Sequence, residues 1–300
     1  MIYLLASVVL SVLLLLNFRL FPRYQVDTFQ AIVFNYPICF LTGYLLLPAG
    51  TSFRIDLTQT WTWIALGIGV AFVVTFLLSG ASTQRNGITA TSLANNLSLV
   101  IPVCVSLFIL GTSGRRFDAL NYIGLALTVV AVGLSTYKKG EPGTSSGALS
   151  GGLTALLPVA VFLMYGFTNT MINYMNVRYV ADGIHPVVVT LTMVVGAIGA
   201  GFFLLLIRYA RTGEQLRTRN LIGAITLGIP NFLSFYTLVL ALSAFGGNGA
   251  FVYPLYNIGV ILLAAAAAAL FFREKLLTIN KIGLALAVIA IGLISWQELV

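Results

Sequence analysis

Residues 121–137 read NYIGLALTVVAVGLSTY, and residues 280–296 read NKIGLALAVIAIGLISW. The two stretches lie 159 positions apart, and ten of their seventeen aligned residues are identical. Each is apolar and close to the length that crosses a hydrocarbon core of about 30 Å as a helix. A helical unit that occurs twice in an apolar chain indicates two homologous halves, with a site where the halves meet.

Composition indicates the class of protein. Hydrophobic residues make up 59% of the 300 positions and charged residues 8%, against about 45–50% and about 25% in soluble domains. Such a chain cannot cover a water-soluble surface with polar groups, so we expect an all-α integral membrane protein with membrane lipid as a partner. The net charge of +8 is scattered through short connections between apolar runs. This distribution is typical of membrane-flanking residues and argues against a nucleic-acid partner.

Hydropathy over a window of about 20 residues predicts ten transmembrane helices. Their ranges are 2–17, 27–47, 61–80, 87–110, 119–137, 151–172, 186–208, 220–240, 248–272 and 279–297. The longest polar stretch, KKGEPGTSSG at residues 138–147, is rich in Gly and Ser and separates five predicted helices from five. We therefore predict a first five-helix repeat at 1–141, a linker at 142–150 and a second five-helix repeat at 151–300.

Fainter matches extend the repeat beyond the opening pair. Residues 66–68 and 227–229 both read Leu-Gly-Ile, 161 positions apart, and Asn96 matches Asn257 at the same offset. Because each unit holds an odd number of predicted spans, the second unit enters the membrane with the opposite orientation. The expected architecture is therefore ten transmembrane helices arranged as two inverted repeats.

Three segments carry a resemblance to a known family. They are SLANNLSLVIPV at residues 92–103, FVYPLYNIGVILL at 251–263 and FREKL at 272–276, the last followed by the second copy of the repeated helix. With the five-plus-five organisation, the chain resembles the EamA-type transporters of the drug/metabolite transporter superfamily. The resemblance implies a multi-pass protein of the cell (plasma or inner) membrane, in a fold that carries very different cargoes. EamA repeats usually place a Glu before the last helix pair of each half; Glu274 fits this pattern, whereas the first half has Gly114-Arg115-Arg116.

Polar side chains inside the spans give the candidate binding site. Such groups are costly in lipid unless they face protein or a water-filled cavity. Amides and tyrosines recur at helical spacing in the ranges 87–110, 151–172 and 248–272, and further polar residues lie in 27–47 (Gln30, Asn35, Tyr36) and 220–240 (Asn231, Ser234). We predict substrate contact for Asn95, Asn96, Ser98, Tyr165, Asn169, Tyr253, Tyr256 and Asn257. Amides would orient a polar ligand and tyrosines would supply flat contact area; the alternative is hydrogen bonding that only holds helices together.

The predicted spans lack certain residue types, and this absence restricts the possible classes of function. All eight carboxylates fall at the ends of predicted spans or in connections, whereas proton-coupled transport normally needs an ionisable group in the pathway. We therefore expect a secondary transporter or exporter of a small neutral or zwitterionic metabolite or drug-like solute, working by alternating access. The alternative is a non-transporting scaffold or lipid-handling subunit with the same fold. Motifs for catalysis, metal binding or a cofactor do not occur in the sequence, so we expect no enzyme, no cofactor and no metal.

Charge counting and the family resemblance give opposite orientations. The odd-numbered loops hold twelve Lys and Arg residues and the even-numbered loops hold four. The positive-inside rule then places both termini outside the cell, whereas ten-helix members of the family usually have both termini inside.

We expect a monomer or a homodimer.

Overall fold

The computed structural model of the chain is built from α-helices. It describes residues 1–47, 50–108, 118–136, 148–175, 178–179, 186–213, 215–245, 249–274 and 276–294, and within these ranges no strand occurs. The helices are α1 (Ile2–Leu20), α2 (Thr28–Leu45), α3 (Thr60–Asn86), α4 (Ile88–Leu97), α5 (Val100–Phe108), α6 (Ala119–Thr136), α7 (Ala148–Met175), α8 (Pro186–Thr212), α9 (Thr218–Ala244), α10 (Gly249–Phe272) and α11 (Thr278–Ile294). The all-helical class is therefore confirmed for this part of the chain. Most of the predicted linker at 142–150, and Gly114-Arg115-Arg116, lie outside it.

Six segments in the described ranges are long and apolar enough to cross a membrane. They are Ile2–Leu20, Thr60–Asn86, Leu156–Met175, Pro186–Thr212, Thr218–Ala244 and Val252–Phe272. Large apolar side chains also point away from the protein interior, and Leu270 and Phe271 are 77% and 73% exposed. Monomeric soluble proteins rarely expose extended apolar surface. These features support a multi-pass membrane protein whose outer surface faces lipid.

The range 87–110, predicted as one helix, is divided into α4 and α5. The interruption falls at Ser98 and Leu99, one turn before Pro102. Proline lacks a backbone N–H and its ring clashes with the carbonyl four residues earlier, which here belongs to Ser98. That carbonyl accepts a hydrogen bond from the N–H of Ile101 instead. At the other end, Gly87 has a φ of 98° and separates α4 from α3, a conformation that favours glycine.

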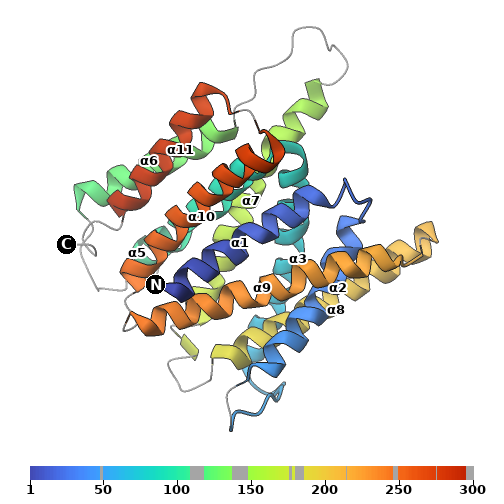
Figure 1. Cartoon of the computed structure of the whole chain (residues 1–300). Coiled ribbons are helices and arrows are strands. Elements are labelled where there is room, and N and C mark those ends of the chain that lie inside the picture. Colours follow the sequence, from blue (N-terminus) through green and yellow to red (C-terminus); the bar gives the residue numbers. More distant parts are fainter. Residues whose placement is uncertain are drawn as a thin grey trace.

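Helices from the two halves of the chain are interleaved. α2 packs along α9 and α3 along α8, while α1 lies against α9 and α7 against α3. Figure 1 shows α6 and α11 as an outer pair next to α10, with α1 and α9 following and then α2 and α8. The largest buried cluster joins Phe18, Tyr36, Phe76, Leu191 and Phe232, which come from α1, α2, α3, α8 and α9. The apolar core therefore lies between the halves rather than within either of them.

The two copies of the repeated helix, α6 and α11, form the most extensive helix pair. Asn121, near the start of α6, donates from Nδ2 to the carbonyls of Leu293 (3.2 Å) and Ile294 (2.8 Å) at the end of α11. Asn280, near the start of α11, donates to the carbonyl of Leu134 near the end of α6 (3.0 Å). The two helices are therefore antiparallel. Asn121 and Asn280 are 159 positions apart, and so are Leu134 and Leu293, so the two contacts are reciprocal.

Candidate functional site

Predicted site residues on α4 and α7 meet at the break before α5. Asn169 of α7 donates to the hydroxyl of Ser98 at 3.5 Å, and this hydroxyl donates to the carbonyl of Asn95. Asn96 is 5% exposed and donates to the carbonyl of Ser92 at 2.8 Å, one turn earlier in its own helix. The structure therefore brings together Asn95, Ser98 and Asn169, whereas this hydrogen bond of Asn96 stays within α4.

The three predicted residues on α10 have different surroundings. The hydroxyl of Tyr256 lies 2.7 Å from the hydroxyl of Ser11 on α1, which connects the second half to the first. Asn257 is buried. Tyr253 keeps 42% of its surface exposed. These three residues thus include one with direct contact to the other half, one that is buried and one that is partly exposed.

A group of hydroxyl side chains lies where five helices converge. Tyr165 of α7 lies in the same neighbourhood as Tyr256 of α10 and Tyr36 of α2. The hydroxyl of Ser79 on α3 is near that of Tyr165, although the two do not meet the geometry of a hydrogen bond. We name Ser11, Tyr36, Ser79, Tyr165 and Tyr256 the central hydroxyl cluster. Its members come from α1, α2 and α3 in the first half and from α7 and α10 in the second.

A second polar group joins α2 to α9. Asn231 donates from Nδ2 to Oδ1 of Asn35 at 3.1 Å. The thiol of Cys39 lies 3.3 Å from the same oxygen and 3.3 Å from the carbonyl of Gly228. Sequence reasoning noted Asn35, Tyr36 and Asn231 as polar residues of their helices but did not assign them to the site. The spacing within one helix identifies a polar face, but it does not show that α2 and α9 turn these faces toward each other.

Several buried polar atoms in this region have no hydrogen-bond partner in the part of the chain that the structure describes. They are Nδ2 of Asn35, Oη of Tyr36, Oγ of Ser79 and Oγ1 of Thr83 and Thr89. An unsatisfied buried polar group costs about 1–3 kcal/mol, so such groups usually bind protein, water or a ligand. Tyr165 and Tyr256 lie deep among the helices and still keep part of their surface accessible. Unpaired polar atoms next to accessible tyrosines are groups that can form hydrogen bonds with a small polar solute.

The side chains of this region also limit its chemistry. The central hydroxyl cluster, together with Asn35, Cys39 and Asn231, contains hydroxyls, amides and one thiol. Such groups exchange hydrogen bonds with an uncharged solute but offer no full charge to neutralise an ion. Within the described ranges there is no group of three or more His, Cys, Asp or Glu residues that could hold a metal ion. The region is therefore suited to reversible binding.

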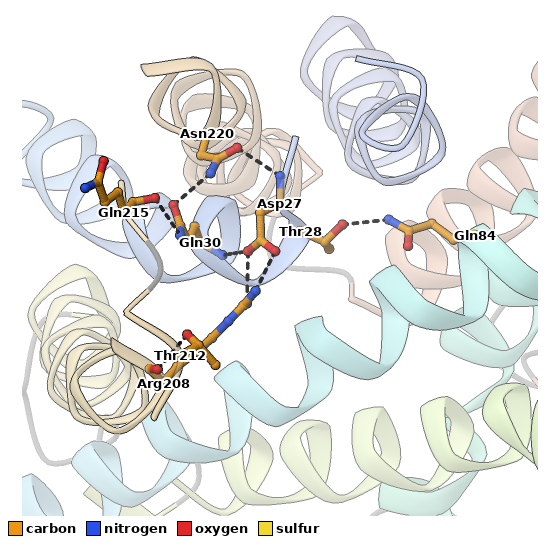
Figure 2. Close-up of polar contacts among 8 residues, drawn as sticks. All are labelled: Asp27, Thr28, Gln30, Gln84, Arg208, Thr212, Gln215 and Asn220. Atoms are coloured by element: carbon orange, nitrogen blue, oxygen red, sulfur yellow. Dashed lines mark hydrogen bonds and ion pairs between the residues drawn. The ribbon is translucent and has the colours of Figure 1, made fainter. Parts of the chain in front are cut away.

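Polar contacts between the halves close one end of the helices. We name it the basic end, and it includes residues 21–27, 84–88, 208–213, 215–220 and 273–274. Figure 2 shows Asp27, just before α2, facing Arg208 of α8. The guanidinium of Arg208 donates to both carboxylate oxygens of Asp27, at 3.1 and 2.9 Å. Asp27 also caps α2 by accepting a hydrogen bond from the backbone N–H of Gln30 at 2.7 Å.

Asn220 of α9 completes this arrangement. Its Oδ1 accepts from the backbone N–H of Asp27 at 2.9 Å, and its Nδ2 donates to Oε1 of Gln30 at 2.7 Å. Gln30, which is 2% exposed, donates in turn to the carbonyl of Gln215 at 3.4 Å. We name Asp27, Gln30, Arg208 and Asn220 the Asp27 network. It holds the start of α2 against the end of α8 and the start of α9 (Figure 2).

Two neighbouring contacts extend the closure of the basic end. Gln84 of α3 donates to the hydroxyl of Thr28 at 2.7 Å, which fixes the start of α2 against α3 (Figure 2). Glu274, which follows α10, accepts a hydrogen bond from the backbone N–H of Ile88 at 3.1 Å. A carboxylate at this position satisfies a free donor at the start of α4 and interacts favourably with the helix dipole. Glu274 thus connects the second half to the first.

Two known proteins are similar to this chain over nearly its full length. No protein-family model matches the sequence. A protein of Haemophilus influenzae, described as an uncharacterized protein, is 26% identical over 291 residues, which are 96% of this chain and 94% of that protein. A solved crystal structure of a protein matches with a TM-score of 0.55 and 17% identity over 97% of both chains. The chain is therefore similar to both over nearly its full length, and the second similarity shows a shared fold.

Proposed function

We propose that the chain is a secondary transporter or exporter that moves a small neutral or zwitterionic metabolite or drug-like solute across the cell membrane by alternating access. The observation that carries this proposal is the central hydroxyl cluster, because it is assembled from helices of both halves. Two-halved transporters bind their solute between the halves and expose it to each side in turn. In this protein the cluster lies beside unpaired polar atoms.

The proposal includes ten spans arranged as two inverted repeats. Corresponding helices of the two halves pack in three pairs, α2 with α8, α4 with α10 and α6 with α11. The start of α2 meets the end of α8 through Asp27 and Arg208, and the start of α4 meets the end of α10 through Ile88 and Glu274. The α6–α11 pair is antiparallel as well. A two-fold axis along the membrane normal would leave such pairs parallel, so these contacts favour an axis in the membrane plane.

Other contacts support the same exchange of halves. The packing of α2 on α9 is repeated by that of α8 on α3, and the packing of α1 on α9 by that of α7 on α3. These relations follow from aligning α1 to α6 with α7 to α11 in order, with α4 and α5 together matching α10. They support the resemblance to EamA-type transporters of the drug/metabolite transporter superfamily, which we retain as part of the proposal.

The composition of the central hydroxyl cluster supports an uncharged or zwitterionic cargo. Its five members carry hydroxyl groups, and the adjacent Asn35 and Asn231 carry amides. Desolvating a fully charged solute without an opposite charge is costly, whereas hydroxyls and amides match carbonyl, hydroxyl and amine groups. Transport through this site therefore needs no carboxylate proton relay.

A non-transporting scaffold or lipid-handling subunit is the second candidate. Hydrogen bonds such as that between Ser11 and Tyr256 also hold helices together in proteins that move nothing. The two candidates differ in one measurable respect, because a scaffold has no solute that stabilises the purified protein and crosses the bilayer with it.

The experiment starts with a thermal-shift screen of purified protein against amino acids, nucleosides, sugars and common drugs, since a compound that binds the folded state raises its apparent stability. The most stabilising compound is then used in a flux assay with proteoliposomes. Tyr256→Phe removes the hydroxyl that bonds Ser11, and we expect flux to fall about fivefold, as the loss of about 1 kcal/mol of hydrogen bonding implies. Tyr44→Phe is the matched control, because Tyr44 is 52% exposed and lies outside the predicted site, and we expect it to leave flux unchanged. A screen without stabilising compounds, together with no flux, would favour the scaffold.

A further inference from the structure

The repeat predicts no equivalent of the Asp27 network at the opposite end of the protein. The two halves correspond at offsets of 159 to 161 positions. The counterparts of Asp27 are therefore Pro186 to Val188, and those of Gln30 are Val189 to Leu191. The counterparts of Arg208 are Leu47 to Ala49. None of these counterparts is charged, so the opposite end cannot form the same ion pair.

Several interactions converge on the same few atoms at the basic end. The carboxylate of Asp27 accepts two hydrogen bonds from Arg208 and one from the backbone of Gln30. Its backbone N–H is held by Asn220, and the guanidinium of Arg208 lies 4.9 Å from the centre of the Phe29 ring. Bidentate pairing fixes direction as well as distance, and cation–π contact restrains the arginine further. The start of α2 is thereby held in one position relative to α8 and α9.

This firm closure lies next to a region with unsatisfied polar atoms. Thr83 and Ser79 of α3 are four residues apart, on one helical face, and both hydroxyls are buried without a partner in the described ranges. Thr83 lies one turn nearer to the basic end than Ser79. Separation of the halves at this end would hydrate such groups, which favours opening, whereas the Asp27 network opposes it. The balance between the two sets the resting state.

We propose that the Asp27 network is a latch that keeps the basic end closed at rest, so that the resting protein exposes the central hydroxyl cluster toward the opposite end. Its part in transport rests on the proposed function, but its effect on closure does not. Because the latch has no counterpart in the other half, the two conformations of the cycle differ in free energy. Asp27 and Arg208 are gating residues and do not contact the solute.

The test measures how accessible Thr83, which lies near the basic end, is to a thiol reagent. Cys39→Ala and Cys104→Ser remove both native cysteines, and Thr83→Cys supplies one thiol at a position with 0% exposure. In this background, Asp27→Asn removes the ion pair but keeps a good capping residue for α2. Alkylation by N-ethylmaleimide is followed by mass spectrometry on the full-length protein in lipid nanodiscs, with thermal unfolding as a check of folding.

We expect Asp27→Asn and Arg208→Gln to raise the alkylation rate about fivefold, the factor that corresponds to about 1 kcal/mol. Arg211→Gln is the matched control, because it removes the same charge from the exposed last turn of α8, and we expect no change. Equal rates in Asp27→Asn and Arg211→Gln would overturn the latch. Faster alkylation without flux of any tested solute would support the latch and contradict the transport proposal. Flux with unchanged alkylation would contradict the latch and support the transport proposal.

Discussion

The α6–α11 pair and the Asp27 network both join the two halves of the chain, but only the first is symmetric. In the helix pair, Asn121 and Asn280 occupy equivalent positions, and each bonds the end of the opposite helix. In the network, Asp27 and Arg208 meet once, and the repeat places uncharged residues at the equivalent positions of the opposite end. The close sequence match is found in the symmetric region and is absent from the asymmetric one.

This difference separates two kinds of contact between repeats. A contact that the repeat symmetry maps onto itself stabilises both conformations of a symmetric transport cycle equally. We call such a contact, here the α6–α11 pair, the frame. A contact that exists at one end stabilises only the state in which that end is closed. Substitutions in the α6–α11 pair should therefore lower stability without changing which end is open. Substitutions in the Asp27 network should mainly change which end is open.

The largest effect is expected from Gly124, where α6 packs tightly against α11. A Cβ at Gly124 would lie 2.9 Å from the side chain of Ile294 and 3.0 Å from the carbonyl oxygen of Ala290. Gly124→Ala should therefore force the helices apart and cost about 1–3 kcal/mol of stability, as overpacking usually does. The change is measured as a lower apparent melting temperature of the purified protein.

Gly133 is the matched control on the same helix. A Cβ at Gly133 would have no neighbour within 4 Å, and alanine is a better helix former by about 1 kcal/mol. We expect Gly133→Ala to keep or raise the melting temperature. Equal destabilisation by the two substitutions would show that the close α6–α11 packing is not what stabilises the frame.

A smaller effect is expected from removing the reciprocal hydrogen bonds. Asn121→Leu and Asn280→Leu each remove an amide that bonds the opposite helix. Hydrogen bonds between membrane helices contribute about 1 kcal/mol, so we expect both variants to lose about that much, and similar amounts. Neither should change the alkylation rate of Thr83→Cys. A large loss in one variant and none in the other would contradict the symmetry of the frame.

Much of the fold could be predicted from the sequence, because it depends on local patterns. Nine of the ten predicted helical ranges each coincide with one helix within a few residues. The packing of α6 against α11 was not predicted, because a repeat in the sequence does not show which of its copies are in contact. The exception is the range 87–110, where Pro102 interrupts the helix. Hydropathy alone does not reveal this interruption, because it depends on the clash between the proline ring and the carbonyl of Ser98.

The candidate site was harder to predict because it depends on how helices face each other. Spacing within single helices selected Tyr165 and Tyr256, which the structure brings close together. The same spacing selected Tyr253, which is partly exposed, and passed over Tyr36 on α2. The Asp27 network was not predicted at all, since its members lie up to 193 positions apart in the sequence. Charged residues at helix ends are normally ascribed to the membrane surface, so no sequence pattern indicated that Asp27 and Arg208 meet.

The smallest expected effect concerns ionic strength. The side chains of Arg208 and Asp27 are 31% and 28% exposed, so salt can screen their attraction, although the paired geometry limits the effect. Raising the salt concentration from about 0.05 M to about 0.5 M should speed the alkylation of Thr83→Cys roughly twofold when Asp27 is present. The Asp27→Asn variant should label at its higher rate in both solutions. The same salt response in both proteins would assign it to other charges at the basic end, whereas a response confined to the protein with Asp27 would identify the ion pair as the asymmetric element.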